Sequence, residues 1–232
     1  MRRRTAGVLP VDELVPARIA RAATKDPKEV IRALEPLVTD KRKERLHKVI
    51  DARLGSVAVV FDAPHDPHNG AAVLRSCEAF GVQRLHVVER RERFLAATSV
   101  ARGAEKWVDI LRHVDAASAA TAVSSFELVA AHAEGELAPE DLAAIPRLAL
   151  VLGNERQGVG ADLERICSRR VRVPMRGFVE SLNVSVTAAI LLEAATRGRA
   201  GDLEEEAKLR LYARGLYFSV AHADEVIAAL SL

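Results

Sequence analysis

Apolar and polar residues alternate along most of the chain in blocks that predict strands and helices in turn. Short apolar runs, typical of strands buried on both faces, are expected to form strands at Ser56–Asp62, Arg84–Glu89, Trp107–Leu111, Leu128–His132 and Leu148–Leu152, with a sixth strand ending at Val173. Helices are expected at Ala71–Phe80, Asp115–Ser124, Pro139–Ile145, Asp162–Cys167 and Val184–Leu192. This alternation predicts an α/β fold with a mostly parallel sheet that carries helices on both faces.

The two ends of the chain have a different pattern, which predicts helices without strands. Asp12 and Asp26 are plausible helix starts, and a helix from Asp40 would place Leu46, Val49 and Ile50 on one side. One or two further helices are expected after Asp202. We therefore expect a helical N-terminal extension at residues 1–53, an α/β domain at 54–200 and a C-terminal helical extension at 201–232.

Composition allows a sizeable core, because 49% of the 232 residues are hydrophobic. The net charge of +2 conceals basic clusters at Arg2–Arg4, at five positions between 41 and 48, and at Arg165, Arg169, Arg170, Arg172 and Arg176. Such clusters suggest contact with a polyanion, although solvated charge runs are common. We expect RNA backbone to be bound by Lys41, Arg42, Lys43, Arg45 and Lys48.

The two cysteines and the absence of long apolar runs bear on the compartment. Cys77 and Cys167 lie far apart without ligand-like neighbours, which predicts neither a disulfide framework nor a metal site. No apolar run reaches membrane length, and no signal-peptide core is evident at the N-terminus. These features favour a cytoplasmic protein in a reducing environment.

The stretch from Val171 to Ala194 is the strongest candidate site. A strand that ends at Pro174 and a glycine turn precede a segment in which Ser181, Asn183 and Ser185 lie at the start of a very apolar helix. One such residue could simply cap the helix, but three within five positions exceed what capping needs. Strand ends of open α/β sheets are also where ligands bind.

Two earlier stretches also carry polar residues at strand ends. Asn69 stands where the cap of the next helix is expected, and Arg75 follows on a mostly apolar helix. Arg75 could form a surface pair with Glu78 or could bind an anion. The loop Gly153–Gly160 contains Glu155 and is rich in glycine, but its spacing fits neither a Walker loop nor the dinucleotide fingerprint.

Together these stretches resemble the three motifs of the SpoU/TrmH family of RNA 2′-O-methyltransferases. The matching sequences are Asp66-Pro-His-Asn-x-x-Ala-x-x-Arg75, Leu152-Gly-Asn-Glu-Arg-Gln-Gly158 and Val173-Pro-Met-x-Gly-x-x-x-Ser-Leu-Asn-Val-Ser185, in the order and spacing of the family. The resemblance covers roughly residues 40–195.

The resemblance implies S-adenosylmethionine as methyl donor, an RNA ribose 2′-hydroxyl as acceptor, a homodimer and a deep C-terminal trefoil knot. It implies a catalytic role for Arg75, supported by Asn69, Glu155, Ser181 and Asn183. It also implies that the donor is bound at Ala131, Gly153, Val173 and Leu182. Arginine stays protonated in water, so Arg75 would act either as a base deprotonated by its setting or as a cation that holds phosphate and stabilises the oxyanion.

Within the family the chain most resembles the tRNA guanosine-2′-O-methyltransferases that act on the D-loop. The resemblance lies in Glu44–Arg53, ahead of the first strand, and in Gly103-Ala-Glu-Lys-Trp-Val108. Two alternatives remain open. The same chemistry could act on ribosomal RNA, or the chain could be a doubly wound nucleotide-binding or RNA-binding protein without methyl transfer. The three motifs together disfavour the second alternative, because binding alone would not require Arg75, Ser181 and Asn183.

Overall fold

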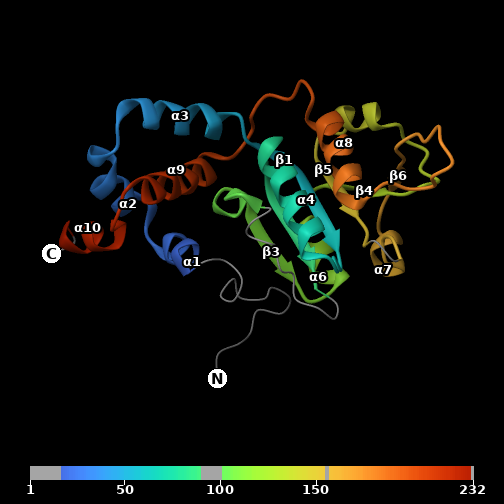
Figure 1. The fold of residues 1–232 in the computed structure, drawn as a ribbon, viewed down its shortest axis with the longest axis horizontal. Helices are drawn as coiled ribbons and strands as arrows, with labels where there is room; N and C mark the ends of the chain where they lie inside the picture. Colours follow the sequence, from blue (N-terminus) through green and yellow to red (C-terminus); the bar gives the residue numbers. More distant parts are fainter. Residues whose placement is uncertain (1–16, 90–100, 155–156, 231–232) are drawn as a thin grey trace. The chain divides into compact units, whose positions relative to one another are not determined.

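The structure is a computed structural model that describes residues 17–89, 101–154 and 157–230. These residues form two compact units, which we call the sheet unit (residues 55–199) and the helical unit (residues 17–54 and 200–230). The helices expected at the two ends of the chain therefore belong to one unit (Figure 1). The helix start expected at Asp12 lies outside the described residues.

The sheet unit is built on a six-stranded sheet in the order β3-β2-β1-β5-β4-β6. Its strands are β1 (Leu54–Asp62), β2 (Val82–Val88), β3 (Asp109–His113), β4 (Glu127–Ala131), β5 (Leu148–Leu152) and β6 (Arg169–Val171). Strand β1 pairs with β5, β5 with β4, β4 with β6, and β2 with β3, all in parallel. The expected α/β fold with a parallel sheet is confirmed.

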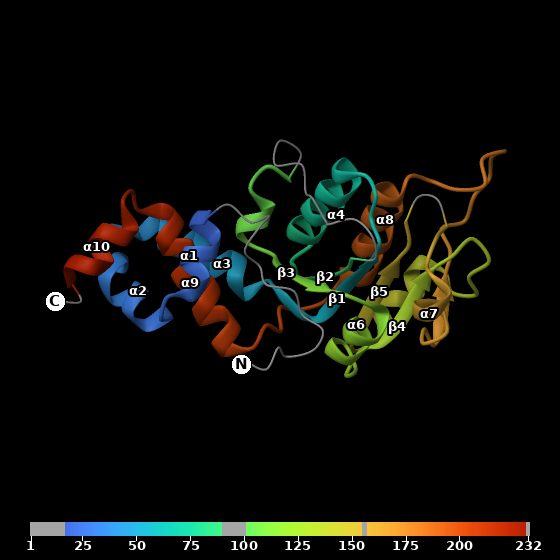
Figure 2. The same cartoon turned by 90° about the horizontal axis from the view of Figure 1, so that it is seen from below.

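Helices cover both faces of this sheet, as the sequence predicted. They are α4 (Pro67–Ala79), α6 (Ala116–Ala122), α7 (Ala161–Glu164) and α8 (Val184–Thr196), with the short 3-10 helices η3 (Ala104–Lys106) and η4 (Pro139–Ala144). On one face Ala58, Val60 and Val151 pack against residues of α6 and α7 such as Ala119 and Leu163. Helices α4 and α8 lie over the opposite face and contact each other (Figure 2).

Several element boundaries differ from the sequence prediction for local reasons. Helix α4 begins at Pro67, because the Asp66 side chain accepts the backbone N–H of His68 and so acts as the N-cap. Asn69 is therefore not the cap; it lies in the first turn of α4. Strand β3 begins at Asp109, after η3, and ends at His113, two residues later at each end than expected. Strand β6 ends at Val171 rather than at Val173. Helix α7 ends earlier than expected, at Glu164, and α8 ends later, at Thr196.

The helical unit consists of five α-helices and a short 3-10 segment among its described residues. They are α1 (Ala17–Thr24), α2 (Pro27–Leu34), η2 (Glu35–Leu37), α3 (Asp40–Asp51), α9 (Glu205–Ser219) and α10 (Ala223–Leu230). Helix α9 contacts α1, α2 and α3 and buries Leu211, Tyr212, Leu216 and Tyr217. The start expected at Asp26 is confirmed, since its carboxylate accepts the N–H groups of Lys28 and Glu29.

Helix α3 packs against α9 along a narrower apolar stripe than the sequence predicted. Of the three apolar residues expected on one side, Leu46 and Ile50 are buried, whereas Val49 is 45% exposed. The closeness of the two helices shows at Gly215 of α9, where an added Cβ would lie 2.6 Å from a methyl group of Leu46. A larger residue at position 215 would push against the buried Leu46 side chain.

No helix in the described part of the chain is long and apolar enough to cross a membrane. Within the same residues, no group of three or more His, Cys, Asp or Glu side chains is placed to hold a metal ion. Both cysteines are free, with Cys77 buried and Cys167 partly buried. Burial raises the pKa of the Cys167 thiol to about 11, which makes it a poor nucleophile.

Candidate active site

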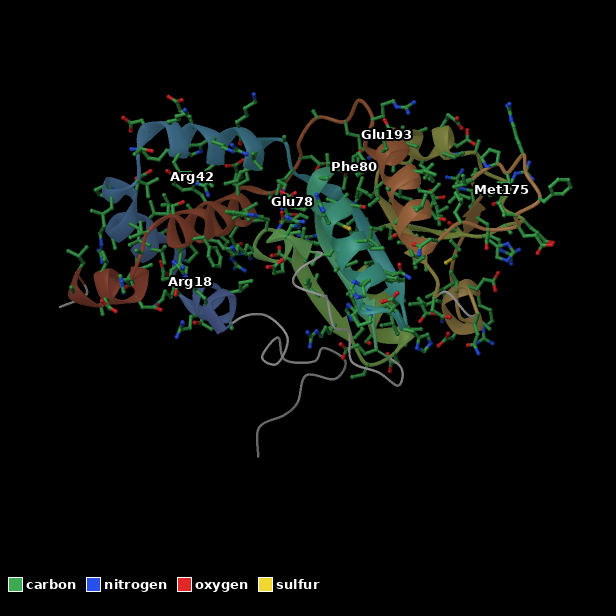
Figure 3. The ribbon with its side chains drawn as sticks, in the orientation of Figure 1. Arg18, Arg42, Glu78, Phe80, Met175 and Glu193 are labelled. Atoms are coloured by element: carbon green, nitrogen blue, oxygen red, sulfur yellow. The ribbon has the colours of Figure 1, made fainter. Side chains whose placement is uncertain are left out.

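A cavity of about 470 Å³ opens at the carboxyl ends of β4 and β5, where ligands bind in open α/β sheets. The segment from Val171 to Thr187 forms its other walls (Figure 3 marks Met175 on this segment). The cavity is lined by all four residues that the resemblance assigned to the donor, Ala131, Gly153, Val173 and Leu182. Ser181 and Asn183 line it as well.

The loop that follows β5 is folded tightly upon itself at the cavity wall. The backbones of Asn154 and Gly158 exchange hydrogen bonds of 3.0 and 3.1 Å, and the side-chain oxygen of Asn154 accepts the N–H of Gln157 at 2.8 Å. A Cβ at Gly153 would lie 2.0 Å from the carbonyl carbon of Gly158. Position 153 therefore requires glycine, because no side chain fits between the two ends of the loop.

Asp62 holds the far end of this loop against β1. Its side chain is fully buried at the carboxyl end of the strand, and its Oδ2 accepts the N–H of Gly160 at 2.7 Å. The sequence reasoning passed over Asp62. The available signal was an acidic residue that closes a continuous apolar strand, where a carboxylate would be costly to bury without a partner.

Asn183 joins the first and third motifs through its side chain. Its Nδ2 donates to Oδ1 of Asn69 at 3.0 Å, and its Oδ1 accepts from the backbone N–H of Ser185 at 2.8 Å and from Oγ of Ser185 at 2.7 Å. Asn183 is thus the N-cap of α8 and also fixes α8 to the first turn of α4. Three of the predicted polar residues, Asn69, Asn183 and Ser185, therefore form one hydrogen-bonded group.

Ser181 and Asn183 contribute differently to the cavity. The amide of Asn183 is engaged with protein partners, whereas the hydroxyl of Ser181 has no hydrogen bond to a described residue. Glu180 is the only carboxylate among the described residues that line the cavity. A free hydroxyl and a carboxylate beside the start of α8 give the cavity mouth hydrogen-bonding capacity for a ligand.

Arg75 lies apart from the cavity within the described chain. Arg75 is exposed and shares the outer face of α4 with Ala72 and Ala79. Asn69 is buried on the side of α4 that faces α8. Among the described residues, the cavity lining does not include Arg75. Glu155, the remaining predicted catalytic residue, lies outside the described residues.

The five basic residues predicted on α3 separate into two groups. Arg42 donates to Oγ of Ser219 on α9 at 3.0 Å (Figure 3), and Lys43 forms an ion pair of 2.7 Å with Asp40. The other three recur at i, i+4 and i+7 on the exposed surface and have no ion pair to a described residue: Lys41, Arg45 and Lys48. These three residues, which we call the α3 basic stripe, share one helix face.

The arginine cluster near β6 is partly neutralised, contrary to its appearance in the sequence. Arg169 pairs with Glu127 at 2.6 Å, and Arg170 pairs with Glu164 at 3.0 Å. Glu127 comes from a distant part of the chain, which sequence proximity could not show, whereas Glu164 directly precedes the cluster. The pKa of Arg169 is raised by its hydrogen bond to Glu127, so its charge is used within the fold.

Comparisons with known proteins agree with this geometry. The profile of the SpoU rRNA Methylase family matches residues 56–193. A tRNA (guanosine(18)-2′-O)-methyltransferase of Thermus thermophilus is 31% identical over 69% of this chain and 84% of its own length. The Aquifex aeolicus TrmH/SpoU tRNA modifying enzyme superimposes with a TM-score of 0.70 at 28% identity, covering 78% of this chain and 98% of its own.

The chain belongs to the SpoU methylase family, as its three motifs indicated. It is accordingly a methyltransferase that uses S-adenosylmethionine as methyl donor. A further solved relative, an rRNA methyltransferase from Sinorhizobium meliloti with AdoMet bound, is 25% identical with a TM-score of 0.54 over 64% of this chain and 59% of its own.

The cavity residues fit this donor. A volume of about 470 Å³ suits a ligand of drug-like size. Gly153 has no side chain, so its backbone forms part of the cavity wall. Apolar residues such as Leu152, Val171 and Val173 line the cavity beside the polar groups at its mouth. A ligand with an aromatic base and several hydrogen-bonding groups matches such a lining.

Proposed function

We propose that the chain transfers the methyl group of S-adenosylmethionine to the ribose 2′-hydroxyl of guanosine-18 in the D-loop of tRNA. The observation that carries the proposal is the cavity, where residues of the second and third motifs meet and the Asn69–Asn183 bond attaches the first motif. The curated relative from Thermus thermophilus, of which the chain covers 84%, is named for this reaction.

The chemistry requires an acceptor oxygen held in line with an electrophilic methyl group and relieved of its proton. The donor supplies the methyl group on a sulfonium, and Ala131, Gly153, Val173 and Leu182 are the residues proposed to bind it. We assign Ser181 to orient the acceptor ribose through its free hydroxyl. Asn183 and Asn69 maintain the cavity mouth, because their amides bond to each other.

Arg75 is proposed to act on the acceptor from the exposed surface of α4. It either takes the proton of the 2′-hydroxyl or holds the adjacent phosphate and stabilises the developing oxyanion. Its exposed position leaves the guanidinium accessible to RNA. Glu155 is proposed as a supporting carboxylate on the loop that Asp62 and Asn154 fix.

A trefoil knot in the sheet unit is also proposed, and the path of the chain around β6 supports it. Strand β6 pairs with β4 on one side. Leu137, from the connection that leaves β4, also bonds to the carbonyl of Arg170 in β6 and to the N–H of Arg172 directly after it. That connection continues through η4, against which α8 packs. A chain segment that passes inside an earlier connection is what a knot requires.

The exposed apolar surface of the sheet unit supports a homodimer. A helix as apolar as α8 is usually buried on every side, yet Val186 and Ile190 are 46% and 37% exposed. Phe178, Val179 and Leu182 on the preceding loop are exposed as well, and we call these five apolar residues the apolar patch. We propose that a second copy of the chain covers this patch, which adjoins the cavity mouth at Ser181 and Asn183.

The helical unit is proposed to bind tRNA through the α3 basic stripe, which lies in the N-terminal extension at residues 1–53. We propose the cytoplasm as the compartment of the protein, because the proposed substrate is tRNA. Incubating unmodified total RNA with the purified chain and labelled donor tests the substrate class. Label in the tRNA fraction supports the proposal, and label confined to ribosomal RNA contradicts it in favour of the same chemistry on rRNA.

A further inference from the structure

His132, at the carboxyl end of β4, has one ring nitrogen that is engaged in the fold. Its Nδ1 lies 3.0 Å from the backbone nitrogen of Glu134 and accepts that N–H. A neutral imidazole that accepts at Nδ1 carries its hydrogen on Nε2. The loop geometry therefore makes Nε2 a hydrogen-bond donor.

The backbone around His132 is also fixed. Its N–H donates to the carbonyl of Val171 at 2.9 Å, and its own carbonyl accepts the N–H of Gly135 at 3.1 Å. A Cβ at Gly135 would lie 2.4 Å from the carbonyl carbon of Val171, so the turn is pressed against the strand end. Little freedom remains for the ring to turn away, and its position is set before any ligand binds.

His132 lines the donor cavity, where two of the other polar side chains, those of Asn154 and Asn183, are already engaged. The side-chain oxygens of Asn154 and Asn183 accept hydrogen bonds from their own loops, whereas Nε2 of His132 has no partner among the described residues. Neighbouring lining residues such as Ala131 and Val171 are apolar. A fixed donor in such surroundings favours a ligand with an acceptor at that point and disfavours one without it.

We propose that Nε2–H of His132 donates a hydrogen bond to S-adenosylmethionine and so positions the donor in the cavity. The inference rests on the proposed binding of the donor there. The acceptor is either on the nucleoside, as a ring nitrogen or ribose oxygen, or on the carboxylate of the amino-acid part. S-adenosylhomocysteine has both groups, and 5′-methylthioadenosine keeps only the nucleoside.

Two substitutions separate the role toward the ligand from the role in the loop. His132→Asn keeps an acceptor close to the place of Nδ1 for the Glu134 N–H but removes the donor at Nε2. His132→Gln places an amide N–H close to the reach of Nε2. Calorimetric titration with all three ligands, after thermal melting to confirm folding, measures the effect.

We expect His132→Asn to weaken binding of S-adenosylmethionine and S-adenosylhomocysteine by about threefold to tenfold, as for loss of one neutral hydrogen bond. His132→Gln should stay within about twofold of wild type. The loss in His132→Asn should appear in KM for the donor more than in kcat, because the hydrogen bond is proposed to be made in the ground state as well as in the transition state. Equal weakening for 5′-methylthioadenosine assigns the acceptor to the nucleoside, and no weakening for it assigns the acceptor to the carboxylate.

Wild-type affinity of the folded His132→Asn protein for all three ligands would overturn the inference. If the Asn variant does not fold, His132→Leu, which has no donor at the place of Nε2, takes its place, and wild-type affinity of that variant overturns the inference in the same way. These results differ from failure of the proposed function itself, in which the wild-type chain would bind none of the three ligands.

Discussion

Asn183 shows why a capping interpretation and a functional interpretation of one residue need not exclude each other. Its side-chain oxygen caps α8, and its side-chain nitrogen bonds Asn69 in another motif. From the sequence, a polar triplet at a helix start could be assigned to capping or to a site. The partner across 114 positions of sequence could be found only in the fold.

Arg75 gives the sharpest prediction at the residue scale. Arg75→Lys keeps the positive charge but loses the planar guanidinium, so a role that depends on the fork geometry should not survive. We expect a folded protein with normal donor affinity whose kcat falls about 100-fold, as for loss of a group acting in the transition state. Single-turnover methylation of tRNA measures it.

The control for that prediction is Arg165→Lys, at an exposed arginine on the same unit that has no ion pair to a described residue. The control should turn over like wild type. If Arg75→Lys also turns over like wild type, the guanidinium of Arg75 has no part in the chemical step.

Two buried histidines should make stability depend on pH. His86 and His113 lie on β2 and β3 with Nδ1 and Nε2 2.9 Å apart. Burial, together with the charges of His113 and Arg84, lowers the pKa of His86 to about 3, and burial lowers the pKa of His113 despite the opposing charge of Asp115. Both rings are therefore neutral in the fold and titrate near pH 6.5 when unfolded.

Because the unfolded chain binds more protons below pH 6.5, the free energy of unfolding is highest above that pH and falls as pH decreases toward 3. The expected slope is about 1.4 kcal/mol per pH unit for each histidine. Urea unfolding of wild type and His86→Gln between pH 7 and pH 5 checks it. The variant should lose roughly half of the slope that the histidine pair contributes, and identical slopes would contradict the neutral pair.

At the scale of elements, most strands were predictable because a strand buried on both faces needs a continuous apolar run, as in β1 and β5. Strand β6 was misplaced at its end, because Val171 pairs with Ala131 whereas Val173 lines the cavity. The start of α4 was missed because Asp66 and Pro67 were assigned to the preceding loop. An aspartate cap followed by proline was the available signal.

The α3 basic stripe supports a prediction about RNA binding. Lys48→Ala should weaken tRNA binding and reduce the salt dependence of the affinity by about 0.7 to 0.9 in the log–log slope, as for one lost phosphate contact. Replacing Lys41, Arg45 and Lys48 together should reduce that slope by about two to three, with donor affinity unchanged. Filter binding across a range of salt concentrations measures both.

Lys43→Ala is the matched control, because it removes the same charge from the same helix at a lysine that is paired with Asp40. Its slope should stay closer to wild type than that of Lys48→Ala. Equal slopes for the two variants would show that α3 acts only through its total charge.

At the scale of the whole molecule, the sequence could not show which distant segments pack together. The helices at the two ends form one unit in which the hydroxyl of Tyr212 donates to Glu35 at 2.7 Å. The N–H of Asp202 also bonds the carbonyl of Arg53 at 3.0 Å. The sequence of the N-terminal helices or of the C-terminal helices shows only that each set has an apolar face. It does not show that the two faces cover each other. The cavity residues, in contrast, were predictable through the motifs.

The apolar patch on α8 predicts the oligomeric state. Light scattering should give about twice the chain mass of 25.2 kDa. Ile190→Glu should shift the protein toward monomer, because burying an unpaired carboxylate in an interface is costly. Val114→Glu, at another exposed apolar residue of the sheet unit, should leave the mass unchanged. A wild-type chain that remains monomeric at micromolar concentration would contradict the dimer.

Methyl transfer to a single ribose hydroxyl is the central claim, and one paired measurement tests it most directly. Two synthetic tRNAs that differ only in guanosine or 2′-deoxyguanosine at position 18 are incubated with labelled S-adenosylmethionine and the wild-type chain. The account predicts stoichiometric labelling of the first tRNA, and binding without labelling of the second. Labelling of the deoxy substrate, or failure to label the ribose substrate, would contradict it.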